Sequence, residues 1–178
     1  KQRLLQGHRL AEGSLSYGKG MALGERSPGG GKTHAAVTIH PDQQVTVHTS
    51  IFEQGSGTYT AIRQIVAESL GWPIKKIQVK VWDTDQTGFD SGAGASRNSR
   101  MASEAAHQAA ILAKDQLIQR LSHYFNRPSR FIELDGKQLT VRVSDTSGGG
   151  VRTRELGPIL AGFNENFQSE YRYDDTTH

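Results

Sequence analysis

The sequence predicts an α+β fold in two layers, with helices packed on a mixed β-sheet. Three observations support this prediction. Short runs of alternating apolar and polar residues indicate strands at 34–40, 45–51 and 77–81. Two longer runs, 58–70 and 98–123, carry apolar residues at helical spacing. A glycine-rich loop directly precedes each helix, so the core reads β-β-α-β-α, followed by a hairpin and a short helix.

Composition narrows the class of protein. The chain has 178 residues, of which 35% are hydrophobic, enough for a modest core in one domain or two small ones. The absence of cysteine excludes a disulfide, a thiolate metal site, an iron–sulfur cluster and a cysteine nucleophile. The net charge of +3 comes from scattered residues, so we expect no nucleic-acid partner.

No targeting or membrane signal stands out. No apolar run approaches the ~20 residues that span a membrane, and no signal-peptide pattern is present. We therefore expect a cytoplasmic protein without a membrane partner. Because the first residue is Lys1 rather than methionine, we also expect a piece of a longer protein.

The first residues are expected to form a helix over 1–16 and a glycine-punctuated lead-in with a short strand at 21–23. The run from Gly29 to Thr33 invites interpretation as a nucleotide-binding P-loop, which would be a third kind of function. We reject it because Arg26 stands where that pattern requires glycine, and an alternating strand follows instead of a helix.

Turn residues divide the rest of the chain. A turn at 41–43 joins the first two strands as an antiparallel hairpin, and Gly71 with Pro73 ends the first helix. Asp135-Gly136 indicates a second hairpin, between strands at 131–134 and 139–143. A loop at 144–150, a short helix at 153–160 capped by Gly162, and a polar extended or mobile end from 164 to 178 complete the chain. The expected parts are a helix and lead-in at 1–33, an α+β unit at 34–125, and a hairpin, short helix and polar tail at 126–178.

The two glycine-rich loops, 53–58 and 91–99, are the candidate site. Glycine lets a ligand approach the backbone, and a helix N-terminus behind the loop offers unpaired N–H groups and partial positive charge. A single such loop is weak support, since glycine also simply makes turns. Two loops about forty residues apart in one unit point to an anion or phosphate site.

An ordered set of motifs follows the same stretch. From Gly18 to His123 the chain resembles the molybdenum-cofactor-binding part of the large subunit of molybdenum hydroxylases, the relatives of xanthine dehydrogenase, aldehyde oxidase and carbon monoxide dehydrogenase. The family pattern contains E-x-G-Q-G-x-x-T, L-G-x-P, D-T-D and G-x-[AS]-S-R in this order. The matching runs here are Glu53–Thr60, Leu70–Pro73, Asp83–Asp85 and Gly94–Arg97.

The resemblance implies a cofactor and its contacts. The cofactor would be molybdenum on a pterin dithiolene, with a cytosine dinucleotide as one form. Around it, the implied binding residues are Gly55, Ser56, Gly57 and Thr58 near the metal, and Gly94, Ala95, Ser96, Arg97 and Asn98 around the pterin or phosphate end. The implied partners are the remaining domains of the large subunit, iron–sulfur and flavin subunits or domains, and a small substrate that is hydroxylated or oxidised with oxygen from water.

The chain also departs from the family. Serine stands at Ser56, where the family usually has a glutamine whose amide contacts the cofactor. The family's G-x-G-E motif, whose glutamate is the catalytic base, is absent. No catalytic residue is therefore assigned, and the isolated segment is expected to be inactive. These departures support the alternative of a non-catalytic anion-binding or assembly module, and exposed apolar surface on a cut segment would allow self-association.

Several other residues have ordinary explanations. Glu53 is expected to cap the loop through nearby backbone donors rather than act as an acid or base. Asp83 and Asp85 favour turn bonding over metal binding. The seven histidines lack ligand spacing, so no metal site is predicted from them. Arg97 is either a phosphate ligand or part of a structural salt bridge.

Overall fold

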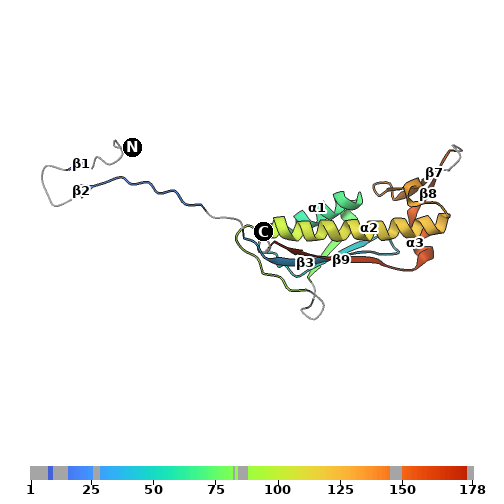
Figure 1. The fold of residues 1–178 in the computed structure, drawn as a ribbon, viewed down its shortest axis with the longest axis horizontal. Helices are drawn as coiled ribbons and strands as arrows, with labels where there is room; N and C mark the ends of the chain where they lie inside the picture. The colour runs from blue at the N-terminus through green and yellow to red at the C-terminus, as the bar shows by residue number, and fades with distance from the viewer. Residues whose placement is uncertain are drawn as a thin grey trace.

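The structure is a computed structural model, and it describes residues 8–9, 16–25, 29–81, 83, 88–144 and 150–175. Its largest part is a sheet with the helices α1 and α2 lying over one face (Figure 1). This arrangement confirms the predicted α+β class with helices on a mixed sheet. No helix in the described part of the chain is long and apolar enough to cross a bilayer.

The main sheet has four strands in the order β5 (Ile77–Val81), β4 (Val45–Thr49), β3 (Lys32–Ile39) and β9 (Phe167–Asp174). The β3–β4 pair is the predicted antiparallel hairpin. The β4–β5 pair is parallel, because helix α1 carries the chain over the sheet between them. Strand β3 is buried on both faces, unlike a half-exposed alternating strand, because it lies at the centre of the sheet.

Helix α1 spans Thr58–Leu70, as predicted, and ends at Gly71 in the left-handed conformation. A π-helical turn, η3 (Asn98–Ala102), leads into helix α2 (Ser103–Phe125). The buried face of α2 is largely alanine, which lets the helix lie close to α1 and to the sheet. The buried residues of α2 are Ser103, Ala105, Ala106, Ala109, Ala110, Ala113, Leu117 and Leu121.

A second, antiparallel sheet joins β6 (Ile132–Asp135), β7 (Thr140–Ser144) and β8 (Val151–Glu155). The β6–β7 hairpin confirms the signal at Asp135-Gly136. Short 3₁₀ turns, η2 (Ile74–Lys76) and η4 (Ser129–Phe131), precede β5 and β6.

The C-terminal third corrects two predictions. Residues 153–155 belong to strand β8 rather than to a helix, because they pair with β7; the helix α3 spans Leu156–Phe163 and ends at Asn164 rather than at Gly162. Of the two alternatives predicted for the polar end, extended or mobile, the structure shows the extended one over Phe167–Asp174, because β9 pairs with all of β3. Its alternate side chains, from Phe167 to Tyr173, pack against the core. The three-part division of the chain stays a prediction, and β9 links the last part to the sheet of the middle part.

The N-terminal predictions were wrong where the structure describes them. His8–Arg9 (β1) and Ser16–Tyr17 (β2) form a short antiparallel pair where a helix was expected. Two glycines, Gly7 and Gly13, disfavour a helix there by roughly 1 kcal/mol each. The other residues of 1–15 lie outside the described part. Residues 21–23 form no strand and are exposed.

Candidate cofactor-binding site

The first glycine-rich loop leaves the main sheet after β4 and enters helix α1. Gly55 and Gly57 have φ angles of 81° and 75°, a left-handed conformation that residues with a Cβ adopt at a cost. Gly57 immediately precedes the first residue of α1. The loop therefore turns sharply enough to place the N–H groups of the helix N-terminus beside the chain that leads into it.

The carboxylate of Glu53 occupies this N-terminus. Its Oε1 accepts hydrogen bonds from the N–H groups of Gln54 and Gly57, both at 3.0 Å, and its Oε2 accepts one from Tyr59 N–H at 3.1 Å. These backbone bonds, first of all that from Tyr59, lower the pKa of Glu53. The capping role predicted for Glu53 is thus what the structure shows, and these donors of the first loop already have an anion from the protein itself.

Ser56 uses its hydroxyl within the loop. Its Oγ lies 2.8 Å from the hydroxyl of Thr58 and 3.3 Å from Glu53 Oε1. Thr58 is fully buried. The short side chain at position 56 therefore stabilises the loop, and the neighbouring Gln54 reaches the surface beside it.

The second loop differs from the first, because it has backbone N–H groups that no carboxylate of the described residues binds. Ala95 and Ser96 have φ angles of 44° and 59°, which costs on the order of 1–3 kcal/mol for each residue. Arg97 then returns to the right-handed region. Such a change of hand turns successive N–H groups to one side, the geometry of an anion-binding nest. Within the described residues, the N–H groups of Ala95 and Ser96 have no hydrogen-bond partner.

Arg97 holds this loop in place through the contacts of its guanidinium group. Its guanidinium is almost buried, lies 3.1 Å from Asp90 Oδ1, and donates to the carbonyl oxygens of Gly92 and Lys32. Asp90 also accepts from Gly92 N–H at 2.7 Å and from the hydroxyl of Thr33. Of the two interpretations of Arg97, the geometry favours the structural salt bridge, since the guanidinium nitrogens that carry these contacts face the protein.

Two glycines at the end of the lead-in, Gly29 and Gly31, hold the second loop and the residues beside it. Gly29 N–H donates to Ala95 O at 2.7 Å, and a Cβ on Gly29 would lie only 2.8 Å from that of Ala95. Gly31 donates its N–H to Asp175, whose carboxylate also binds Arg100 at 2.7 Å. The run Gly29–Gly31 therefore serves close backbone packing, which agrees with the rejection of the P-loop interpretation.

The two loops meet at one surface depression of about 480 Å³. Gln54 and Ser56 line it from the first loop; Gly94, Ala95, Ser96, Asn98 and Ser99 line it from the second. Asn98 Oδ1 is buried there and has no hydrogen-bond partner among the described residues. A buried polar atom without a partner is costly, so a ligand with a hydrogen-bond donor would fit this position.

Five of the nine predicted residues therefore share the depression: Ser56, Gly94, Ala95, Ser96 and Asn98. Gly55, Gly57, Thr58 and Arg97 instead shape the loops behind it. Prediction from the sequence missed the contributions of Gln54 and Ser99. Both lie inside the predicted loops, so the loop boundaries alone could have indicated them.

The other candidate residues, the histidines and Asp83, form no metal site in the part of the chain that is described. Asp85 lies outside that part, although Asp83 lies inside it. No group of three or more histidine or carboxylate side chains is placed to hold a metal ion among the described residues.

The two adjoining loops present hydroxyl, amide and N–H groups at one depression. The sequence matches the molybdopterin cofactor-binding domain family over residues 2–173. The chain therefore belongs to this family of molybdopterin cofactor-binding domains.

The similar proteins are much longer than this chain. The chain is 39% identical over 85 residues to the xanthine dehydrogenase molybdenum-binding subunit of Escherichia coli O157:H7, which is 47% of this chain and 11% of that subunit. It is 25% identical over 158 residues to the aldehyde oxidoreductase molybdenum-binding subunit PaoC of the same organism, or 87% of this chain and 21% of that subunit. The chain thus spans about a tenth to a fifth of the length of these relatives.

Solved structures share the fold. Quinoline 2-oxidoreductase from Pseudomonas putida 86 matches with a TM-score of 0.66 and 22% identity, over 82% of this chain and 19% of that one. Carbon monoxide dehydrogenase from Oligotropha carboxidovorans matches with a TM-score of 0.67 and 22% identity, over 81% and 18%.

Proposed function

We propose that this chain is the segment that holds the molybdenum-pterin cofactor in the large subunit of a molybdenum hydroxylase. The observation that carries the proposal is the meeting of the two glycine-rich loops at one depression, although they lie about forty residues apart in the sequence. The family of the chain supports the same cofactor.

The residues at the depression suit the two ends of such a cofactor. The open N–H groups of Ala95 and Ser96, with the Ser96 and Ser99 hydroxyls, suit phosphate oxygens, which accept hydrogen bonds. The unpartnered Asn98 Oδ1 suits an N–H of a pterin. When bound, the cofactor supplies the metal centre that oxidises a small substrate with oxygen from water. From the first loop, Gln54 and Ser56 line the depression.

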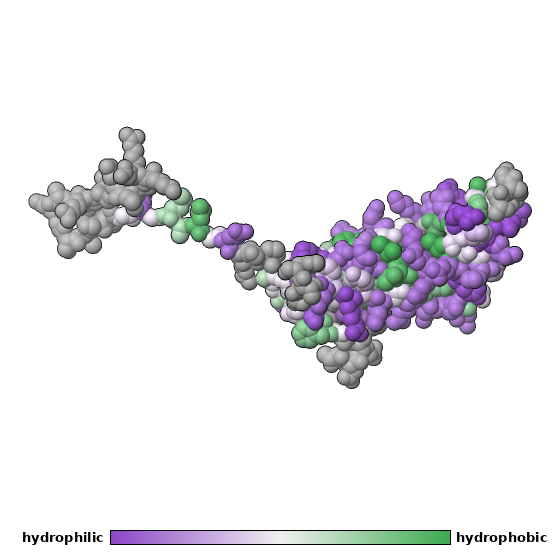
Figure 2. Space-filling view, in the orientation of Figure 1, coloured by the Kyte–Doolittle hydropathy of each residue, from purple (hydrophilic) through white to green (hydrophobic). Residues whose placement is uncertain are grey.

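The rest of the enzyme follows from this assignment. Electrons would leave through iron–sulfur and flavin groups on other subunits or domains, since the chain has no cysteine. Phe52 and Phe89, which are 66% and 74% exposed, precede the two loops and suit packing against further parts of the large subunit. On the face seen in Figure 2 the surface is otherwise mostly hydrophilic, with small separate hydrophobic patches. The cytoplasmic location and self-association of the chain stay predictions.

The test is cofactor capture by the complete large subunit, produced with its partner subunits. A Cβ on Gly94 would meet no atom within 4 Å, so Gly94→Phe adds a phenyl ring at the lining of the depression from an unobstructed backbone position. Gly162→Phe, on helix α3 and equally unobstructed, is the matched control. We expect bound molybdenum and pterin at about one per chain in the wild type and the control, and a loss of roughly tenfold or more in Gly94→Phe.

The same assay separates the enzyme from its alternative. Glu53 already fills donors of the first loop, and Ser56 turns its hydroxyl to Thr58; both features also suit a module that no longer binds cofactor. A well-folded large subunit that holds no molybdenum under cofactor-replete conditions would favour this anion-binding or assembly module.

A further inference from the structure

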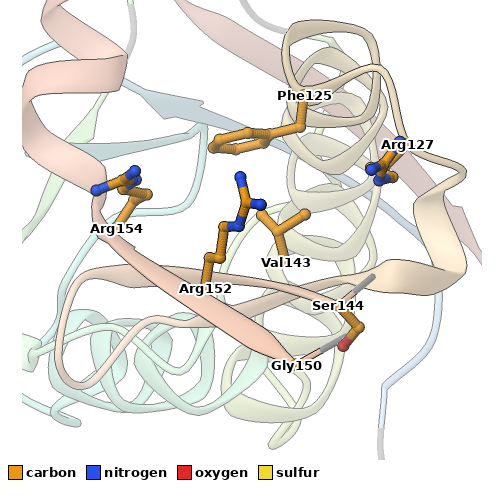
Figure 3. A pocket seen from close by; sticks show the side chains of 7 residues that line it. All are labelled: Phe125, Arg127, Val143, Ser144, Gly150, Arg152 and Arg154. Carbon is orange, nitrogen blue, oxygen red and sulfur yellow. The ribbon is translucent and has the colours of Figure 1, made fainter. Parts of the chain in front are cut away.

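A hollow of about 150 Å³ lies on the second sheet, among elements that the proposed cofactor site does not use. The end of helix α2 and the strands β7 and β8 form it (Figure 3). The Phe125 ring and the Val143 side chain give it an apolar base. The guanidinium groups around this base come from Arg127, Arg152 and Arg154.

The two arginines of β8 share one face of the strand, because they are two residues apart. In the register with β7 they stand opposite Val143 and Val141, both of which are buried. Figure 3 shows the Arg152 and Arg154 side chains on the side of the strand where Phe125 lies. The two guanidinium groups therefore lie on the core side of this edge strand, where an apolar side chain is usual.

Neither arginine of β8 has an acidic partner within the described part of the chain. Five other arginines have a carboxylate within 4 Å: Arg97, Arg100, Arg120, Arg142 and Arg172. Two unpaired guanidinium groups beside one hollow attract an anion.

The size and lining of the hollow limit which anion fits. Sites for drug-sized ligands occupy about 300–1,000 Å³, so this hollow is too small for a nucleotide. Inorganic phosphate would gain nothing from the phenyl ring and the valine. A glutamate or aspartate side chain matches both parts, with methylene groups on Phe125 and a carboxylate on the arginines.

The neighbouring backbone indicates how such a side chain arrives. Strand β8 pairs with β7 on one side only, and all five of its residues are exposed. An open edge can accept a further strand, with side chains of that strand seated in adjacent hollows. A second copy of β8 would place arginine beside arginine, which disfavours pairing between copies.

We propose that the β8 edge and the arginine hollow bind an extended acidic polypeptide segment, which adds a strand beside β8 and places a carboxylate between Arg152 and Arg154. The segment belongs to a partner protein. This inference does not depend on the cofactor, so it can fail or succeed separately from the proposed function.

The test measures binding of a fluorescently labelled hexaglutamate peptide to the full 178-residue chain. Fluorescence anisotropy gives the dissociation constant at about 0.05 M and about 0.3 M salt. Hexaglutamine is the uncharged control peptide. The variants are Arg152→Gln/Arg154→Gln and the charge-retaining Arg152→Lys/Arg154→Lys, and Arg172→Gln on β9 is a matched exposed arginine outside the hollow. Thermal unfolding of each variant verifies that it is folded.

We expect hexaglutamate to bind, hexaglutamine to bind at least about tenfold more weakly, and the double glutamine variant to lose affinity by about tenfold or more. The double lysine variant should lie between, and Arg172→Gln should match the wild type. Binding that is equal for both peptides, or unchanged in the folded double glutamine variant, overturns the proposal. Displacement of the peptide by low millimolar inorganic phosphate would instead indicate a small-anion site and would also overturn it.

Discussion

Glu53 and Asn98 show how single residues separate the two loops. The Glu53 carboxylate takes three backbone N–H groups of its own loop, so this helix N-terminus is satisfied within the protein. Asn98 has a buried oxygen without a partner among the described residues. The backbone donors that Glu53 binds in the first loop are therefore not available to a ligand. The second loop carries the open donors and acceptors that a ligand would use.

Gly29 allows a prediction about how the second loop is held. In Gly29→Ala the new methyl group would lie 2.8 Å from Ala95 Cβ, closer than van der Waals contact allows. We expect a loss of about 1–3 kcal/mol in the free energy of unfolding, as for other overpacked sites. Denaturant unfolding measures this loss.

Gly24→Ala serves as the control for that change, since its Cβ would meet no atom within 4 Å. An equal effect of both substitutions would contradict the close packing of Gly29 on the second loop.

At the residue scale, the sequence indicated roles that depend on near neighbours. The cap formed by Glu53 was predictable, because its donors are at most six residues away. The role of Arg97 was left open between two interpretations, although its salt-bridge partner Asp90 is near in the sequence, because an irregular loop has no periodicity that indicates which side chains meet. The other contact of Arg97, with Lys32 O, spans 65 residues. No local pattern indicates a contact over that distance.

At the scale of elements, helices α1 and α2 and the two hairpins were predicted because their hydrogen bonds are local. Helix α1 and the β6–β7 hairpin carry their own spacing and turn signals. Strands β8 and β9 were missed because their pairing depends on distant partners. Strand β9 did show a signal, the alternation of Phe167, Ser169, Tyr171 and Tyr173, but the charged residues between them resemble a solvated tail.

The alanine face of helix α2 leads to a prediction about packing. Ala109 is fully buried in the core between the helices and the sheet. Ala109→Leu should lower the free energy of unfolding by about 1–3 kcal/mol, because the larger side chain has no space there. Urea unfolding followed by circular dichroism measures the change.

The matched substitution is Ala161→Leu, at an exposed position of helix α3. It should stay within about 0.5 kcal/mol of the wild type. Comparable losses for both variants would contradict the explanation that close packing of α2 leaves no space for a larger side chain at residue 109.

For the whole molecule, three shifted groups predict sensitivity to acid. Burial, followed by Lys80 and His40, lowers the pKa of His48 to about 4 from 6.5. The pKa of Glu53 and that of Asp175 are also lowered, in Asp175 first by the hydrogen bond from Arg100. In each case the folded state binds fewer protons than the unfolded state. The stabilisation is therefore present at neutral pH and is lost as the pH falls below about 6.5 and through the lowered pKa values.

Thermal unfolding between about pH 7.5 and pH 3.5 tests this expectation. The midpoint should decrease with acidification, and His48→Gln should make the decrease shallower between about pH 6.5 and pH 4. Glu53→Gln should lower the midpoint at neutral pH and converge with the wild type in acid. A midpoint that rises as the pH falls would contradict the prediction.

The pairing of β9 with β3 sets the order in which the protein can be completed during synthesis. Gly31 and Asp175 are 144 residues apart, yet they bond directly beside the second loop. At about 5–20 residues per second, a ribosome needs roughly 7–30 s to make the chain between them. Throughout that time β3 lacks one neighbour and exposes an unpaired edge to other chains. Until β9 has been made, the second loop therefore lacks the bond between Gly31 and Asp175 that lies beside it.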